Sequence, residues 1–164
     1  MVKRTSFEND PCPVARALEV IGDWWSLLIV REAFFGVRRF NEFQGKLGLA
    51  KNILASRLRT LVEHGILRLV PAADGSAYHE YLLTPKGQGI FPILVALRQW
   101  SEQFDPRPEE IATVLVDRNN GRPVRTLELH AEDGRLLSPA DTTLQPRSTA
   151  KSKKAGTRSS ATSN

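Results

Sequence analysis

Residues 38–65 read RRFNEFQGKLGLAKNILASRLRTLVEHG and contain two short helical patterns separated by a tight turn at Gly48. In the second pattern, apolar residues recur every three or four positions, which is the spacing of one buried helix face. These inward residues are Leu54, Leu58, Leu61 and Val62. Polar and basic side chains occupy the opposite face. The stretch therefore predicts a helix-turn-helix unit whose second helix, residues 50–64, exposes a polar surface.

Two helical patterns precede this unit. Pro13 opens PVARALEVIG at a first-turn position that proline tolerates, and Asp23 is a suitable N-cap for DWWSLLIVREAFFG. The second of these patterns is apolar most of the way round, which predicts a central helix. We expect Trp24 and Trp25 to pack in the core.

A hairpin and a final helix follow the unit. The β-prone runs ILRLV and YHEYLLT flank a strong turn signal, Asp74-Gly75. Residues 85–104 then predict one helix with a broad apolar face, for which a second copy of the chain is the simplest partner. The residues expected at this dimer interface are Ile90, Ile93, Leu94, Leu97, Trp100 and Phe104.

The order helix, turn, helix, hairpin is that of a winged helix-turn-helix, so the predicted fold class is mainly α with a small β wing. Residues 1–106 form this DNA-binding and dimerisation domain in our division of the chain. Residues 107–145 are expected to form a β-hairpin appendage of unknown role around a turn at Asn120-Gly121. Residues 146–164 form a basic tail without any apolar residue larger than alanine, which predicts disorder.

The charge distribution points to a polyanionic partner. The 164 residues hold 23 Lys and Arg against 18 Asp and Glu, a net charge of +5. The tail accounts for 5 basic residues and no acidic one. Between Arg38 and Arg68 there are seven basic and two acidic residues, which marks a candidate nucleic-acid surface. The wing tip, PAADGSA, contains neither Lys nor Arg.

Double-stranded DNA is the expected partner. The exposed residues near the start of the second helix would enter the major groove, where Asn pairs with adenine and Arg with guanine. Arginines that flank the unit are placed to meet phosphate. Arg57 points partly sideways and is a candidate for an internal ion pair. The candidate DNA-binding residues are Arg38, Arg39, Lys51, Asn52, Ser56, Arg59 and Arg68.

Catalytic and metal-binding patterns are missing from the sequence. It has no phosphate-binding Gly-rich loop followed by lysine, its three histidines lack metal-ligand spacing, and a single cysteine, Cys12, excludes an intramolecular disulfide. We expect no enzymatic activity, no cofactor and no metal, although a nucleophile pair of Cys12 with a histidine stays open. A run of about 18 apolar residues is also missing, so a cytoplasmic protein without a membrane partner is expected.

Cys12 precedes Pro13 at the start of the first predicted helix, where the helix dipole favours a thiolate. Such a thiolate can be oxidised, capped by a small thiol, or joined to the same residue of a second subunit. The alternative is a half-buried packing cysteine. Cys12 is therefore a possible redox sensor.

Four blocks of the sequence resemble the HxlR-type winged-helix transcription regulators. They are Cys-Pro-Val at 12–14, GDWWSLLIVREAFFGVRRFNEF at 22–43, NILASRLRTLVEHGIL at 52–67, and the stretch from LTPKG to Trp100 at 83–100. The resemblance covers about residues 10–104. It implies a bacterial cytoplasmic homodimer, built by the N- and C-terminal helices, that binds a pseudo-palindromic operator. It places Lys51, Asn52, Ser56 and Arg59 in the groove. The cysteine that aligns with Cys12 senses oxidants, quinones or aldehydes in some members.

The leading hypothesis is a homodimeric transcriptional repressor, with the identity of any small-molecule effector left open. A thiol or electrophile switch at Cys12 is the alternative within this class. Two other classes stay open. One is a non-specific DNA-compacting protein driven by the basic tail, and the other is a protein–protein adaptor that uses the β appendage.

Overall fold

The computed structural model describes residues 6–106 and 113–145 of the chain. The chain divides into two compact units, residues 1–127 and residues 128–164. This division falls some way after the boundary at 106/107 expected from the sequence, because residues 113–127 pack with the first unit. The predicted disordered tail, residues 146–164, lies outside the described residues.

The first two helices are α1, Pro13–Ile21, and α2, Trp24–Phe34. The predicted N-cap is confirmed, because the Asp23 side chain accepts a hydrogen bond from the Ser26 backbone N–H at 3.1 Å. α2 is central as expected, with Ile29 and Val30 fully buried. The expectation for Trp24 is wrong, since 74% of its surface is exposed and only Trp25 packs against the core.

The helix-turn-helix unit consists of α3, Phe40–Leu47, and α4, Lys51–Glu63. Gly48 ends α3 with φ of 64°, a left-handed conformation that glycine adopts without steric cost. The inward stripe of α4 is confirmed, because Leu54, Leu58 and Leu61 are all fully buried in the core. The opposite face of α4 is thereby fixed toward solvent.

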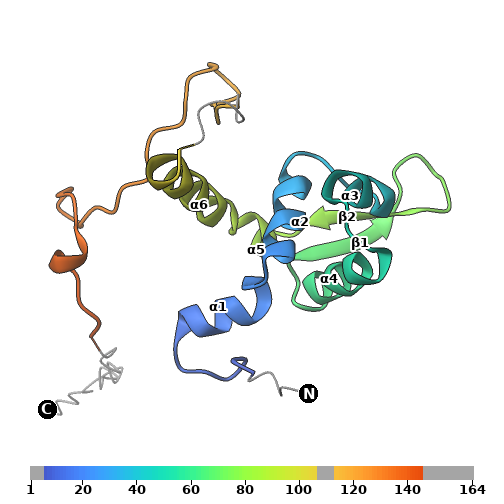
Figure 1. Cartoon of the computed structure of the whole chain (residues 1–164), viewed down its shortest axis with the longest axis horizontal. Coiled ribbons are helices and arrows are strands. Elements are labelled where there is room, and N and C mark those ends of the chain that lie inside the picture. The colour runs from blue at the N-terminus through green and yellow to red at the C-terminus, as the bar shows by residue number, and fades with distance from the viewer. Residues whose placement is uncertain (1–5, 107–112, 146–164) are drawn as a thin grey trace, which may run out of the picture. The chain divides into compact units, whose positions relative to one another are not determined.

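The wing consists of β1, Leu67–Pro71, and β2, His79–Leu83, paired antiparallel from Leu67↔Leu83 to Pro71↔His79. Figure 1 shows these strands next to α3 and α4, with the wing loop projecting beyond the helices. Gly75 in that loop has φ of 73°, as the Asp-Gly turn signal predicts.

The final helix expected at 85–104 is instead two helices, α5, Pro85–Gln88, and α6, Phe91–Phe104. Thr84 caps α5 by accepting a hydrogen bond from the Gly87 N–H at 3.0 Å. A Cβ at Gly87 would lie 2.2 Å from the backbone oxygen of Ile66, so this glycine lets α5 pack directly on the chain entering β1. Pro92 lies in the first turn of α6, where its missing donor costs nothing.

The β hairpin expected within residues 107–145 is reduced, among the residues that the structure describes, to a short antiparallel turn at the expected Asn120-Gly121 position. It has a bridge Val116↔Pro123, with the Asp117 N–H donating to the Arg122 oxygen at 2.8 Å and the Val124 N–H to the Leu115 oxygen at 2.9 Å. A second isolated bridge, His130↔Leu136, lies in the second unit. The alternating apolar residues of this region stay exposed, with Val114 at 66% and Leu129 at 62%. A short 3₁₀ helix, η1, Pro139–Asp141, follows in the second unit.

Candidate nucleic-acid interface

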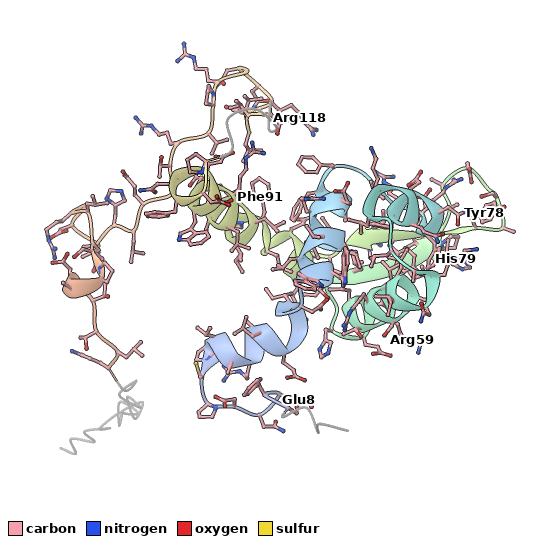
Figure 2. All side chains as sticks on the ribbon, viewed as in Figure 1. Glu8, Arg59, Tyr78, His79, Phe91 and Arg118 are labelled. Carbon is pink, nitrogen blue, oxygen red and sulfur yellow. The ribbon has the colours of Figure 1, made fainter. Side chains whose placement is uncertain are left out.

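The outer face of α4 presents four exposed polar side chains that are free of hydrogen bonds and ion pairs with the other described residues. Asn52, Ser56 and Arg59 follow one another at helical spacing, and no acidic residue lies in the first turn. Figure 2 shows the Arg59 side chain pointing away from the helix. The face consists of Lys51, Asn52, Ser56 and Arg59, all predicted from the sequence.

Arg57 has the internal role that the sequence suggested. Its Nε lies 3.2 Å from Asp23 Oδ1, and its side chain is 31% exposed. Asp23 is also the N-cap of α2, so this ion pair joins α4 to the start of the central helix. The contact fixes the rotation of α4 and leaves its outer face free.

The two arginines before α3 have carboxylate partners that the sequence did not indicate. Arg39, predicted to meet phosphate, is 33% exposed and places Nη2 at 2.5 Å from Asp74 Oδ2 and 3.4 Å from Glu80 Oε1. Arg38 is more exposed, at 56%, and its Nη1 lies 3.8 Å from Glu80 Oε2. Sequence reasoning missed these carboxylates because they are more than thirty residues away along the chain.

Glu42 fixes the start of α3 and was also not singled out from the sequence. Its Oε2 accepts hydrogen bonds from the backbone N–H groups of Arg38 and Arg39, each at 2.9 Å. These two hydrogen bonds lower the pKa of Glu42 below its ordinary value of 4.5, and the bond from Arg38 has the larger effect. The pattern of a carboxylate three residues after the N-cap is a signal that could have found it.

The wing carries one exposed arginine on a strand and an acidic tip. Arg68 lies on β1 opposite Leu82 and is exposed, and His79 at the start of β2 is exposed too. At the tip, the hydrogen bond from Arg39 is the largest of the effects that lower the pKa of Asp74 well below its ordinary value. Figure 2 shows Tyr78 and His79 on this wing.

The predicted dimer residues on α6 and at its N-cap divide into two groups. Ile90 was assigned wrongly, because it is 5% exposed and belongs to the core of the single chain, and Leu94 is partly buried against that core. The remaining four form an exposed stripe at helical spacing. They are Ile93 at 42%, Leu97 at 48%, Trp100 at 61% and Phe104 at 64%.

Cys12 is exposed and is the N-cap residue of α1. Its backbone N–H donates to Asp10 Oδ1 at 2.8 Å. The exposed thiol differs from the half-buried packing cysteine that the sequence left as an alternative. Among the residues that the structure describes, no group of three or more His, Cys, Asp or Glu side chains could hold a metal ion.

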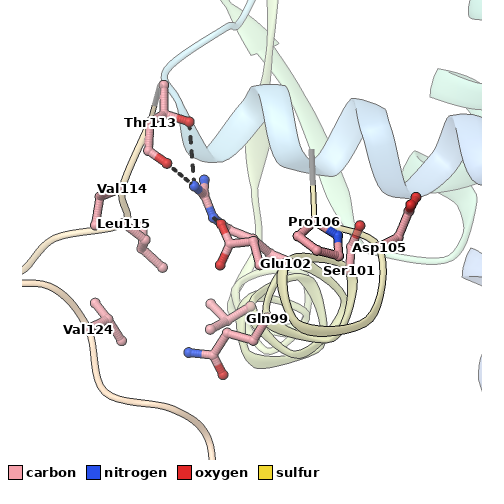
Figure 3. Close-up of a pocket in the computed structure, with 11 residues that line it drawn as sticks. Gln99, Ser101, Glu102, Asp105, Pro106, Thr113, Val114, Leu115 and Val124 are labelled. Carbon is pink, nitrogen blue, oxygen red and sulfur yellow. Dashed lines mark hydrogen bonds and ion pairs between the residues drawn. The ribbon is translucent and has the colours of Figure 1, made fainter. Parts of the chain in front are cut away.

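A hollow of about 350 Å³ lies between α6 and residues 113–124. Figure 3 shows Thr113–Leu115 on one side of it and Gln99, Ser101 and Glu102 of α6 on the other. Arg98 bonds to Glu102 at 2.6 Å and to the backbone oxygen of Thr113. Gln99 bonds through Nε2 to the Arg125 oxygen at 3.0 Å and accepts from the Leu127 N–H at 2.8 Å. These polar groups hold residues 113–127 against α6.

The HxlR-like helix-turn-helix family matches residues 20–109, which span the two-helix unit, the wing and α6. The chain belongs to the HxlR family. The curated relatives that it matches are named HTH-type transcriptional regulators. No helix within the described part of this HxlR protein is long and apolar enough to cross a membrane.

One similar protein is the uncharacterized HTH-type transcriptional regulator Rv3095 of Mycobacterium tuberculosis, 50% identical over 96 residues. That match covers 58% of this chain and 61% of the relative, so the chain spans about three fifths of the length of such curated relatives.

Two solved structures are similar over more of the chain. The crystal structure of PA1607, a proposed transcription factor, is 55% identical with a TM-score of 0.81 and covers 86% of this chain and 99% of its own. PA1374 from Pseudomonas aeruginosa, also a proposed transcription factor, is 38% identical with a TM-score of 0.59, covering 87% and 96%. Each match covers more residues than residues 1–106 contain, so part of the segment after α6 is aligned in both matches.

Proposed function

We propose that this HxlR protein is a repressor that binds a pseudo-palindromic operator as a homodimer, with α4 in the major groove. The outer face of α4 carries the proposal. Asn and Arg make bidentate hydrogen bonds to adenine and guanine edges there, and lysine reaches phosphate or a base edge. Because the opposite face of α4 is fully buried, only this face is available to DNA.

The exposed stripe on α6 supports the homodimer. Ile93, Leu97, Trp100 and Phe104 are apolar and at least two fifths exposed in the single chain, and α1 adds the exposed Leu18 at 51%. A two-fold dimer buries such a surface symmetrically. It also presents two α4 helices to half-sites about one helical turn apart, or a multiple of it. A dimer bound across a promoter in this way is sufficient to repress transcription. We propose that this protein acts in the cytoplasm.

The test compares single substitutions on α4 against a duplex that the wild-type chain selects from a random-sequence pool. Asn52→Ala should relax the preference at one base pair by about 5- to 150-fold, because a good bidentate contact discriminates by about 1–3 kcal/mol. Lys51→Ala should weaken binding to all duplexes alike if Lys51 contacts phosphate. Gln44→Ala on α3 is the control. An unchanged sequence preference in Asn52→Ala would contradict the proposal that α4 reads base edges.

A thiol switch at Cys12 is the second candidate, and the exposure of this side chain favours it. Under this proposal an oxidant or electrophile modifies the thiol at the start of α1, and the dimer then changes its affinity for the operator. Cys12→Ser should abolish any oxidant response while leaving binding under reducing conditions intact. Loss of binding under reducing conditions would instead make Cys12 a structural residue.

A further inference from the structure

Four charged side chains meet where the start of α3 touches the wing. They are Arg38 and Arg39 before α3, Asp74 in the wing loop and Glu80 on β2. Two are positive and two negative, so the group has no net charge to attract phosphate. Arg39 is central to it, since Nη2 contacts both carboxylates, at 2.5 Å and 3.4 Å. We refer to Arg39, Asp74 and Glu80 as the wing clamp.

The Arg39 end of the wing clamp stands on a fixed backbone. The Tyr81 N–H donates to the Arg38 oxygen at 2.8 Å, which links this segment to β2. Glu42 holds the N–H groups of both arginines. The guanidinium therefore starts from a rigid position at the entry to the helix-turn-helix unit.

The wing end is held by contacts within the wing loop. The loop is closed by the Ala72 N–H to the Tyr78 oxygen at 2.9 Å and the Gly75 N–H to the Ala72 oxygen at 3.2 Å. Asp74 accepts through Oδ1 from the Ser76 N–H at 3.0 Å and through Oδ2 from Arg39. The Tyr78 ring lies 5.9 Å from the Arg39 guanidinium carbon. Arg39 is thus the side chain that ties the exposed loop to the helices.

Withdrawing Arg39 from this site would have two costs. Glu80 is 7% exposed, and a buried carboxylate that loses its hydrogen-bonded partner is destabilising. Asp74 would also lose its neutralising partner on the wing tip, beside the phosphates of a bound duplex. Arg59, Lys51 and Arg68 are exposed and have no carboxylate partner among the described residues, so a contact with phosphate would not break an ion pair.

We infer that Arg39 is a positioning residue that sets the wing through Asp74 and Glu80, and that the cations of α4 and β1 neutralise phosphate in its place. This inference rests on the proposed mode of DNA binding. Under this inference Asp74 at the wing tip has a structural role, because it anchors the arginine that precedes the helix-turn-helix unit.

The test measures the affinity of the full chain for a fluorescein-labelled duplex, selected by the wild-type chain from a random-sequence pool, over a series of salt concentrations. Lys51→Ala should lower the slope of log affinity against log salt by about one, as loss of a phosphate contact does. Arg39→Ala should weaken binding about fivefold, the upper range for a partly exposed ion pair, while leaving that slope unchanged. A slope lowered by about one in Arg39→Ala would overturn the inference.

A double-mutant cycle with Asp74→Ala gives a second readout. If Arg39 acts through Asp74, the loss caused by Arg39→Ala should be much smaller in the Asp74→Ala background. Equal losses in both backgrounds would overturn the inference. In the absence of DNA, hydrogen exchange of residues 72–78 should rise in Asp74→Ala but not in Arg59→Ala, which keeps the test decisive if Arg39→Ala folds poorly. Absence of any binding by the wild type would instead count against the proposed function.

Discussion

Leu97→Ala on α6 should weaken the proposed homodimer without unfolding the chain. Fully burying a leucine side chain contributes about 1.5–3 kcal/mol. Since 48% of Leu97 is exposed in the single chain, covering that part contributes roughly half as much per protomer. Two-fold symmetry doubles the effect to about 1.5–3 kcal/mol, or about a 10- to 150-fold weaker dimer.

The matched control is Leu69→Ala on β1, because Leu69 is 46% exposed and lies on the wing. Sedimentation velocity of both variants over a range of protein concentrations gives the dimer dissociation constants, and circular dichroism checks that both fold. Equal dissociation constants for Leu97→Ala and the wild type, or an equal weakening by Leu69→Ala, would refute the assignment of the α6 stripe to the dimer.

Three further predictions concern stability and the segment after α6. Leu58→Ala should lower the free energy of unfolding by about 2–5 kcal/mol because Leu58 is fully buried, whereas Ile53→Ala, at a position 39% exposed, should cost less; urea titration of both tests this. The lowered pKa of Glu42 makes its contribution to stability complete above its ordinary value of 4.5 and lost as the pH falls through the folded value. Glu42→Gln should therefore flatten the acid limb of stability against pH, and parallel limbs in the two proteins would count against this. Gln99→Ala should raise the hydrogen exchange of residues 125–127, with Gln103→Ala as the control, and unchanged exchange would show that Gln99 does not hold this segment.

The sequence predicts most of the first unit because its signals are local. The N-cap at Asp23, the turn at Gly48 and the Asp74-Gly75 turn each depend on a few neighbouring residues, and all three form as expected. The period of the α4 stripe identifies which face is buried. Since the same period identifies the opposite face, the exposure of the four α4 candidates followed from it.

The errors arise where contacts between distant residues decide the outcome. The ion pairs of Arg39 with Asp74 and Glu80 were missed because these acidic partners lie in other parts of the chain. Ile90 belongs to the apolar pattern of residues 85–104, but the break before α6 turns it into the core. Residues 111–137 alternate like strands, yet the described part of this segment leaves many of its apolar side chains exposed and forms only isolated bridges, one of them around the predicted Asn120-Gly121 turn.

Hydroxyl-radical footprinting of the full chain on its selected duplex, at two salt concentrations, tests the proposed function most directly. A two-fold dimer reading DNA through α4 should protect two half-sites related by a dyad, with centres about 10 base pairs apart or a multiple of that, and the protection should persist at moderate salt. Diffuse protection that is lost at modest salt, and lost when residues 146–164 are removed, would contradict this function and favour a DNA-compacting protein driven by the tail.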